Sequence, residues 1–346
     1  MFRTMTSSLR TLFLLLGVGV LVAVGGLGVR WMGGVASEDG VIVLHGASQF
    51  DDRHSYTKAL EHFAERVQVH YDGPERLEFI LHKNGELGVE KDYMGYMNLG
   101  VVVDYAIVSP SHISTFSRMA TVMDIPFTFR DVEHYTRAME AGVFSRVAED
   151  LRDRADVHVL GYGGGEKRHF FGRRPVRTMD ELRGFAMRVQ GAPIQTRMFS
   201  ALGAAPTVIS SAEVYNALQT GVIDGAENSA SAIEQSKWYE VGPEVSLSTV
   251  AIIVRPLIFS GKTFRRLPAA LQQAVVQAGA EAALFERTLE MTQDDALMRQ
   301  LSDEGKVTLH TFSERAAMLE LADSVKAAFA RETGASDVLD AINAIQ

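Results

Sequence analysis

Apolar and polar positions along the chain follow a pattern that predicts strands separated by helices. An apolar run over 41–47 and a second one over 77–82 predict strands, and between them apolar side chains recur at helical spacing from about residue 55 to 69. Another strand is expected over 103–109. Because strands and helices alternate, the pattern predicts an α/β fold with largely parallel sheets.

The segment 185–190 combines the two-residue period of a strand with a charged residue. Phe185, Met187 and Val189 fall on one face of the expected strand, and Arg188 falls on the other. An arginine in so apolar a segment is costly to bury unless it meets an anion, and its planar guanidinium fits a carboxylate through two parallel hydrogen bonds. The spacing alone leaves open a structural ion pair as the alternative.

A capped helix and a turn follow this strand. A capping box of pattern S-x-x-E begins at Ser210 and a glycine stands at the other end, so a helix is expected over 211–220. The Asp-Gly pair that follows is a turn signal, which would place Asn228 at the rim of the surface that Arg188 faces. For Asn228 the alternative is an ordinary turn residue.

Two segments far apart in the sequence are suited to connect two halves of the molecule. The glycine-rich run at 161–165 is where the chain is expected to pass to a second domain, and the apolar run at 250–256 is where it returns. After the return, an amphipathic stretch over 266–304 predicts one long helix that ends near Gly305.

Several of these segments resemble the DctP-type solute-binding proteins of TRAP (tripartite ATP-independent periplasmic) transporters. The similarity extends from about Val41 to the C-terminus in the order typical of that family. The matching runs are NGELGVEKDYM at 84–94, MDIPFTFRDVEHY at 123–135, DELRGFAMRVQ at 180–190, LGA-x-P at 202–206, EVYNALQTGVIDGAEN at 213–228 and LPAALQQAVVQAG at 267–279.

The resemblance implies a two-lobe periplasmic binding protein fold with a central cleft, two crossings between the lobes and a long helix spanning both. Residues 37–165 with about 254–293 are expected to form the first lobe, and residues 166–253 with about 294–346 the second.

The resemblance also implies which residues of the second lobe bind a ligand. Arg188 matches the family's arginine that clamps the ligand carboxylate, and Asn228 matches an asparagine that bonds to the ligand. Arg168 stands where a second basic residue helps to hold the carboxylate. The alternative for Arg168 is a solvated arginine in a basic loop.

Three candidates belong to the first lobe. Gln49 occupies the place from which a polar side chain reaches the ligand, although its surroundings, SQFDD, differ from the family's usual pattern. Glu90 and Ser109 are further candidates, and for both the alternative is a helix cap or a surface residue.

Composition excludes several other classes of function. A net charge of −9 argues against nucleic acid as a partner, because phosphate binding needs a basic face. The chain has no cysteine, its ten histidines include no H-E-x-x-H, and neither a G-x-S-x-G elbow nor a nucleotide-binding glycine pattern occurs. We therefore expect no catalytic site, no metal and no cofactor.

The N-terminus indicates export. Arg3 and Arg10 precede an uncharged run over 11–29, which is typical of a Sec signal, and small residues at 34–37 would suit cleavage. The run approaches the roughly 20 residues that span a bilayer. Residues 1–36 are therefore expected to be a signal peptide or a retained membrane anchor.

Together these features predict a periplasmic, monomeric binding protein for a small organic acid, which it would deliver to the ion-gradient-driven membrane subunits of a TRAP transporter. C4-dicarboxylates, 2-oxo acids, uronates and sialic-type acids all remain open as ligands. One alternative is an exported α/β enzyme, which would need an acid–base pair near Arg188. The other is a membrane-tethered ligand sensor that retains residues 11–29.

Overall fold

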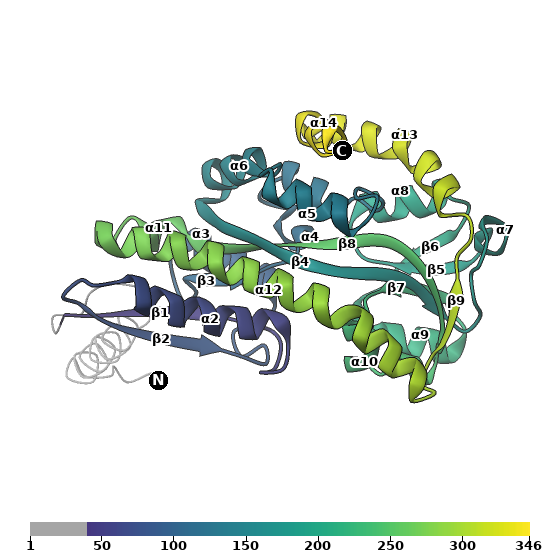
Figure 1. Cartoon of the computed structure of the whole chain (residues 1–346), viewed down its shortest axis with the longest axis horizontal. Helices are drawn as coiled ribbons and strands as arrows, with labels where there is room; N and C mark the ends of the chain where they lie inside the picture. Colours follow the sequence, from purple (N-terminus) through teal and green to yellow (C-terminus); the bar gives the residue numbers. More distant parts are fainter. Residues whose placement is uncertain (1–39) are drawn as a thin grey trace, which may run out of the picture.

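A β-sheet of mixed parallel and antiparallel strands runs through the whole length of the molecule (Figure 1). The computed structural model describes residues 40–346, and within them nine strands form one sheet in the order β2-β1-β3-β8-β4-β7-β5-β6, with β9 beside β8. This architecture confirms the α/β fold class, with helices on both faces of a central sheet.

One end of the sheet is made by the first third of the chain. Its elements are β1 (Val41–Ala47), α2 (Ser55–His70), β2 (Arg76–His82), α3 (Glu90–Leu99), β3 (Tyr105–Ile107) and α4 (Pro110–Ile113). Strand β1 pairs in parallel with both β2 and β3. Leu44, Leu60 and Phe63 are fully buried in a core that also includes Leu271 and Val275 of the long helix. The expected strand over 103–109 is shorter than its apolar pattern, because only three of its residues pair in the sheet.

The other end of the sheet is built from the middle of the chain. Its elements are α7 (Met179–Leu182), β5 (Ala186–Val189), α8 (Pro193–Ala201), β6 (Ala205–Val208), η3 (Ser211–Glu213), α9 (Val214–Thr220), β7 (Gly225–Asn228), α10 (Ala230–Gln235) and η4 (Trp238–Glu240). Strand β5 pairs in parallel with β6 and β7. The predicted helix over 211–220 begins with a 3₁₀ turn at the capping box of Ser210 and ends at Gly221, whose φ is +76°.

Two long strands cross the middle of the molecule and join its two ends (Figure 1). They are β4 (Val157–Gly172) and β8 (Glu244–Ser260). They pair antiparallel to each other, β8 is antiparallel to β3, and β4 is antiparallel to β7. The expectation of largely parallel sheets therefore holds at the two ends but is wrong for the centre, because a chain that crosses and returns must run in opposite directions.

The glycine run at 161–165 lies inside β4, where the long helix α12 (Ala269–Asp303) passes close to the strand. A Cβ atom added at Gly161 would stand 2.6 Å from the Cβ of Ala283. Gly164 and Gly165 have φ values of +102° and +122°, which side chains rarely allow. The glycines therefore let the crossing strand approach the helix and bend beside it.

The long helix agrees closely with the prediction over 266–304, and Gly305 follows it with φ at +70°. It lies against α2 at one end and against α10 at the other (Figure 1). A helix that contacts both ends of the sheet is what the resemblance led us to expect.

The remaining helices cover the opposite face of the sheet (Figure 1). They are η2 (Met119–Asp124), α5 (Val132–Glu140), α6 (Ser145–Ala155), α13 (Arg315–Thr333) and α14 (Ser336–Ala344). The short α11 (Gly261–Phe264) precedes α12 and packs with it through Phe264, and β9 spans Thr308–Thr311. The C-terminal helices contact the first part of the chain, since Lys326 Nζ donates to Phe127 O at 3.0 Å and His134 Nε2 lies 2.9 Å from Ile342 O. The exact lobe boundaries stay a prediction.

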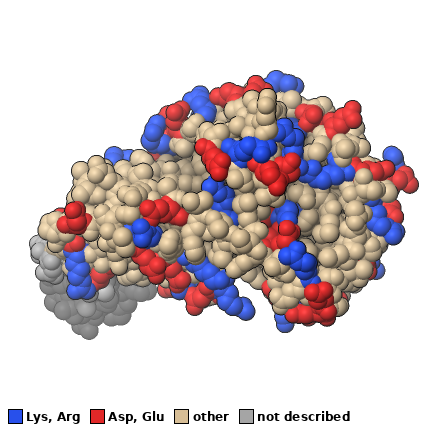
Figure 2. Space-filling view, viewed as in Figure 1, with Lys and Arg blue, Asp and Glu red and all other residues tan. Residues whose placement is uncertain are grey.

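Acidic and basic side chains are interspersed over the face shown in Figure 2, so that face carries no continuous basic surface. Within residues 40–346 no helix is both long enough and apolar enough to cross a membrane. The expectations for residues 1–36, including an anchor over 11–29, fall outside the described part of the chain.

Candidate functional site

A cavity of about 580 Å³ opens between the two ends of the sheet. Its walls come from α2, α3 and α4 on one side, from β5, β7 and α10 on the other, and from the crossing strands β4 and β8. All six residues that the sequence singled out line it: Gln49, Glu90, Ser109, Arg168, Arg188 and Asn228. The structure therefore brings the candidates together, while their contacts with a ligand stay a prediction.

Arg188 is a buried cation that makes no direct ion pair within the described residues. It lies in β5, only 5% exposed, and its Nε donates to the backbone oxygen of Ile209 at 2.8 Å. Within residues 40–346 no carboxylate lies within 4.0 Å of its guanidinium nitrogens. Burial, followed by the nearby Arg168, lowers the pKa of Arg188 to about 10. The structural ion pair is therefore wrong as an explanation, and an anion at this place would relieve the cost of burial.

Arg168 differs from Arg188, because its charge is already paired. Its Nε and Nη2 contact the two carboxylate oxygens of Glu227, with Nη2 to Oε1 at 2.9 Å, and Nη2 also donates to the backbone oxygen of Glu227 at 3.0 Å. Arg168 is 7% exposed and Glu227 2%. The alternative of a solvated loop arginine is wrong, since the side chain is buried at the cavity wall.

Asn228 ends β7, next to His169 of β4. Its Oδ1 accepts from the backbone nitrogen of Ser229 at 3.0 Å, which orients the side-chain amide. Its Nδ2 makes no hydrogen bond within the described chain, so a donor remains for a bound molecule.

The first-lobe candidates form one hydrogen-bonded group around Glu90. Gln49 Nε2 donates to Glu90 Oε1 at 3.2 Å, and Glu90 Oε2 accepts from Ser109 N at 2.6 Å and from His112 Nδ1 at 3.0 Å. Burial alone would raise the pKa of Glu90, but the hydrogen bond from His112 and its charge lower it overall. The same hydrogen bond raises the pKa of His112. Glu90, at 2% exposed, is therefore an ionised wall residue and no surface residue.

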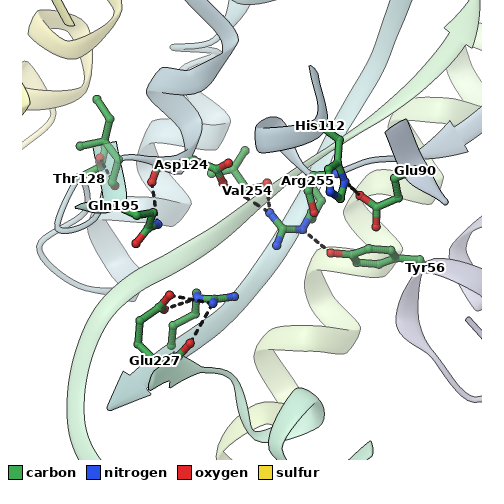
Figure 3. Close-up of polar contacts among 12 residues, drawn as sticks. Tyr56, Glu90, His112, Asp124, Thr128, Gln195, Glu227, Val254 and Arg255 are labelled. Carbon is green, nitrogen blue, oxygen red and sulfur yellow. Dashed lines mark hydrogen bonds and ion pairs between the residues drawn. The ribbon is translucent and has the colours of Figure 1, made fainter. Parts of the chain in front are cut away.

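Sequence reasoning missed Arg255 and Tyr56, which also line the cavity (Figure 3). Arg255 Nε donates to the hydroxyl oxygen of Tyr56, Nη1 donates to Val254 O at 3.0 Å, and Nη1 lies 4.0 Å from Asp124 Oδ1. A signal was present, because Arg255 interrupts an apolar run, TVAIIVRP, as Arg188 interrupts its own strand.

A row of three buried acids on α12 was also missed. Glu286, Glu290 and Asp294 are four residues apart, and their carboxylates accept from the backbone nitrogens of residues 164, 166 and 167 in turn. The β4–β8 ladder shifts its register between Gly164 and Lys167, and the three carboxylates accept from backbone amides at this irregularity. Their spacing on a predicted helix was the available signal.

The histidines do not form a metal site within residues 40–346, where no group of three or more His, Cys, Asp or Glu is arranged to hold an ion. His54 lines the cavity, and its ring accepts from Tyr56 N at 3.2 Å. Burial lowers the pKa of His54 to about 4, so it is a neutral acceptor.

Comparison with known proteins places this geometry in a family. The family described as "Bacterial extracellular solute-binding protein, family 7", DctP, matches residues 46–332. The chain belongs to the DctP family. A curated relative, a solute-binding protein of Sulfitobacter sp. (strain NAS-14.1), is 46% identical over 302 residues, which is 87% of this chain and 91% of the relative.

Solved structures of TRAP periplasmic solute-binding proteins share the fold. A TRAP periplasmic solute-binding protein from Sulfitobacter sp. NAS-14.1 with bound α-D-taluronate is 46% identical, with a TM-score of 0.81 over 87% of this chain and 97% of that one. A second, from Chromohalobacter salexigens with bound D-glucuronate, is 26% identical, with a TM-score of 0.79 over 88% of this chain and all of that one. The predicted family is confirmed.

Proposed function

We propose that this protein is a periplasmic binding protein for a uronate or a closely related acid sugar, which it delivers to the membrane subunits of a TRAP transporter. The observation that carries the proposal is Arg188, a buried guanidinium at the wall of a polar cavity, which has no carboxylate within 4.0 Å among residues 40–346. Two DctP-type structures of the same fold hold taluronate and glucuronate, which are carboxylate-bearing sugars.

In this proposal each wall of the cleft contributes different bonds. Arg188 pairs with the carboxylate through its two terminal nitrogens, and Asn228 and Arg168 donate from the same wall. Gln49 reaches the ligand from the opposite wall. Because the ligand touches both walls, it favours the closed arrangement of the lobes and shifts the population toward it.

Binding without turnover is part of the proposal. Among the described residues that line the cavity, Glu90 and His112 form an ion pair of the kind that an enzyme could use for acid–base chemistry. Both oxygens of Glu90 are already engaged by Gln49, Ser109 and His112, which suits a fixed wall better than proton transfer to a substrate. Recovery of unchanged D-glucuronate after long incubation, followed by NMR, is the expected result, and a new product would favour an enzyme.

The first experiment is a thermal-shift screen followed by titration calorimetry. D-Glucuronate and other uronates are expected to raise the melting temperature by mass action, whereas neutral hexoses are not. A screen in which no organic acid binds, while neutral sugars or amines do, would refute the proposal.

A substitution series then tests Arg188. Arg188→Ala is expected to weaken uronate binding by about 3–5 kcal/mol, because a carboxylate would be left unpaired in the closed cleft, and Arg188→Lys recovers little since it lacks the planar fork. Arg183→Ala, at an exposed arginine of the preceding turn, is the matched control and leaves binding unchanged. Binding by Arg188→Ala within a few-fold of the parent protein would contradict this role.

A further inference from the structure

Four acidic side chains lie close together where the crossing strand β4 meets the long helix α12. They are Glu166 of β4 and Glu286, Glu290 and Asp294 of α12. The three helix acids accept hydrogen bonds from β4 amides, and Ser55 Oγ donates to Glu290 Oε1 at 2.8 Å. Within residues 40–346 no Lys, Arg or His nitrogen lies within 4.0 Å of any of the four carboxyl groups. Four neighbouring carboxyl groups without a direct ion pair cannot all be ionised at low cost.

Glu166 is the member of this group that a bound molecule can reach. It lines the ligand cavity together with Arg188 and Asn228, and it also lines a second cavity of about 600 Å³ between α2, α10 and α12. The three helix acids are at most 3% exposed and do not line the ligand cavity. Glu166 therefore stands in the wall between a bound ligand and the buried acids of α12.

Most of the cations that face Glu166 are already paired with other carboxylates. The helices packed against it and the turn before α2 contribute Glu286, Glu290, Asp294, Glu234, His54 and Arg53. The strands contribute Lys167, Arg168 and Arg255, the second cavity adds Lys237, Tyr239 and Lys306, and the ligand cavity adds Glu90, His112 and Arg188. Ion pairs join Arg53 to Asp51, Lys167 to Asp295, Arg168 to Glu227 and Lys306 to Glu304. Arg255 is the cation whose charge acts on Glu166.

Burial is the main cause that favours the neutral form of Glu166. Burial, followed by the charge of Glu290, raises the pKa of Glu166 from 4.5 to about 7, although hydrogen bonds from Ser231 and Ser229 and the charge of Arg255 act in the opposite direction. Near neutral pH the ligand-free protein therefore holds both forms of Glu166 in comparable amounts, and a change in its surroundings decides between them.

We propose that binding of the acid sugar takes up a proton from solvent at Glu166, so that the affinity for a uronate decreases as pH rises. The ligand displaces water from the cavity that Glu166 lines, and its carboxylate cancels the positive charge of Arg188 in the same cavity. Both effects favour the neutral form of a carboxyl group. By linkage, the contribution of Glu166 to the affinity is constant well below pH 7 and falls above it, because the ligand-free protein must then regain a proton to bind. This inference rests on the proposed function, since it needs an acid in the cleft.

Titration calorimetry of the full protein with D-glucuronate measures this proton directly. The uronate carboxyl group has a pKa of about 3.5 and stays ionised above pH 5.5, so it contributes no proton. Buffers with different ionisation enthalpies are compared, phosphate with Tris at pH 8 and acetate with Mes at pH 5.5. We expect an uptake of at least about 0.3 proton per bound uronate at pH 8 and less than about 0.1 at pH 5.5, with a dissociation constant at least about threefold higher at the alkaline pH.

Binding at pH 8 without proton uptake, or with proton release, would overturn the inference. If D-glucuronate and other organic acids do not bind at either pH, the proposed function itself fails.

Substitutions assign the proton to one residue. Glu166→Gln keeps the side-chain shape and does not titrate, so we expect an uptake below about 0.1 proton at pH 8 and a dissociation constant that changes less than about twofold between the two pH values. Glu166→Ala, which also removes the titrating group, should lose the uptake in the same way. Glu86→Gln, at an exposed glutamate outside both cavities, keeps the uptake of the parent protein. Uptake that persists in both Glu166 variants would place the proton on another group, such as His112 or Asp294, and would overturn the inference.

Discussion

Asp294 connects the long helix α12 to the crossing strand β4 through a hydrogen bond, and its ionisation can be tested. Its Oδ2 accepts from Lys167 N at 3.0 Å, while its Oδ1 is buried without a hydrogen-bond partner in the described chain. The residue is 3% exposed, and burial, followed by the charge of Glu166, raises the pKa of Asp294 from 3.8 to about 7. The native protein therefore holds a proton on this group that the unfolded chain releases at lower pH.

The sign of the pH dependence follows from this raised pKa. Protonated Asp294 makes its full favourable contribution to the free energy of unfolding below about pH 4. This contribution is lost as pH rises through about 7, because the folded protein then keeps a buried carboxylate that the unfolded chain hydrates. The folded and unfolded pKa values differ by about 3, which corresponds to about 4 kcal/mol at 1.36 kcal/mol per pKa unit. This value is an upper limit for the free energy of unfolding that the protein loses between low pH and pH values above 7.

Asp294→Asn removes the charge and keeps the shape. At pH 8 we expect the variant to be more stable than the parent by about 1–3 kcal/mol, since an unpartnered amide group offsets about 1–3 kcal/mol of the gain. At pH 4.5 the same offset remains while only about 1 kcal/mol of the gain is left, so the variant should be less stable than the parent by up to about 2 kcal/mol. Urea unfolding followed by circular dichroism at both pH values measures the difference, and Asp303→Asn, an exposed position of the same helix, should show no pH-dependent change.

The reasoning would be refuted if Asp294→Asn were less stable than the parent at pH 8 by the same amount as at pH 4.5. That result would mean that Asp294 is ionised in the native protein at both pH values and stabilises it as a carboxylate. Burial would then not dominate its pKa.

Three further predictions concern the cleft, the crossing strand β4 and helix α3. Gln49→Ala is expected to weaken uronate binding by about 0.5–1.5 kcal/mol, less than Arg188→Ala, because it removes a neutral hydrogen bond; equal losses in calorimetry would contradict the assigned roles. Gly161→Ala should destabilise the protein by about 1–3 kcal/mol, since its Cβ would lie 2.6 Å from that of Ala283. Gly95→Ala, in helix α3 with no atom within 4 Å of the added Cβ, should instead stabilise it by about 0.5–1 kcal/mol, and both are read from urea midpoints.

Much of the local structure could be predicted from the sequence, because the signals for a strand, a helix or a helix cap come from residues that are close together in the chain. The strand over 41–47 and the helix that ends before Gly305 agree with the apolar pattern within a few residues. The capping box at Ser210 forms as its sequence indicates, because both of its partners lie within one helical turn. Arg188 also stood out locally, as a charge inside an apolar strand.

Which side chains each buried arginine contacts was decided by the tertiary structure alone. Arg168 and Glu227 are 59 residues apart in sequence, and Arg255 and Tyr56 are 199 apart, yet each pair forms a buried contact. The first contact joins the paired strands β4 and β7, and the second joins β8 to helix α2, and no local pattern encodes either arrangement. The sequence by itself therefore identified Arg168 and Arg188 as candidates, whereas the tertiary structure determined that only Arg168 of the two has a carboxylate within 4.0 Å in the described chain. The physical reason is that charge compensation depends on distances of a few ångströms between residues far apart in the chain.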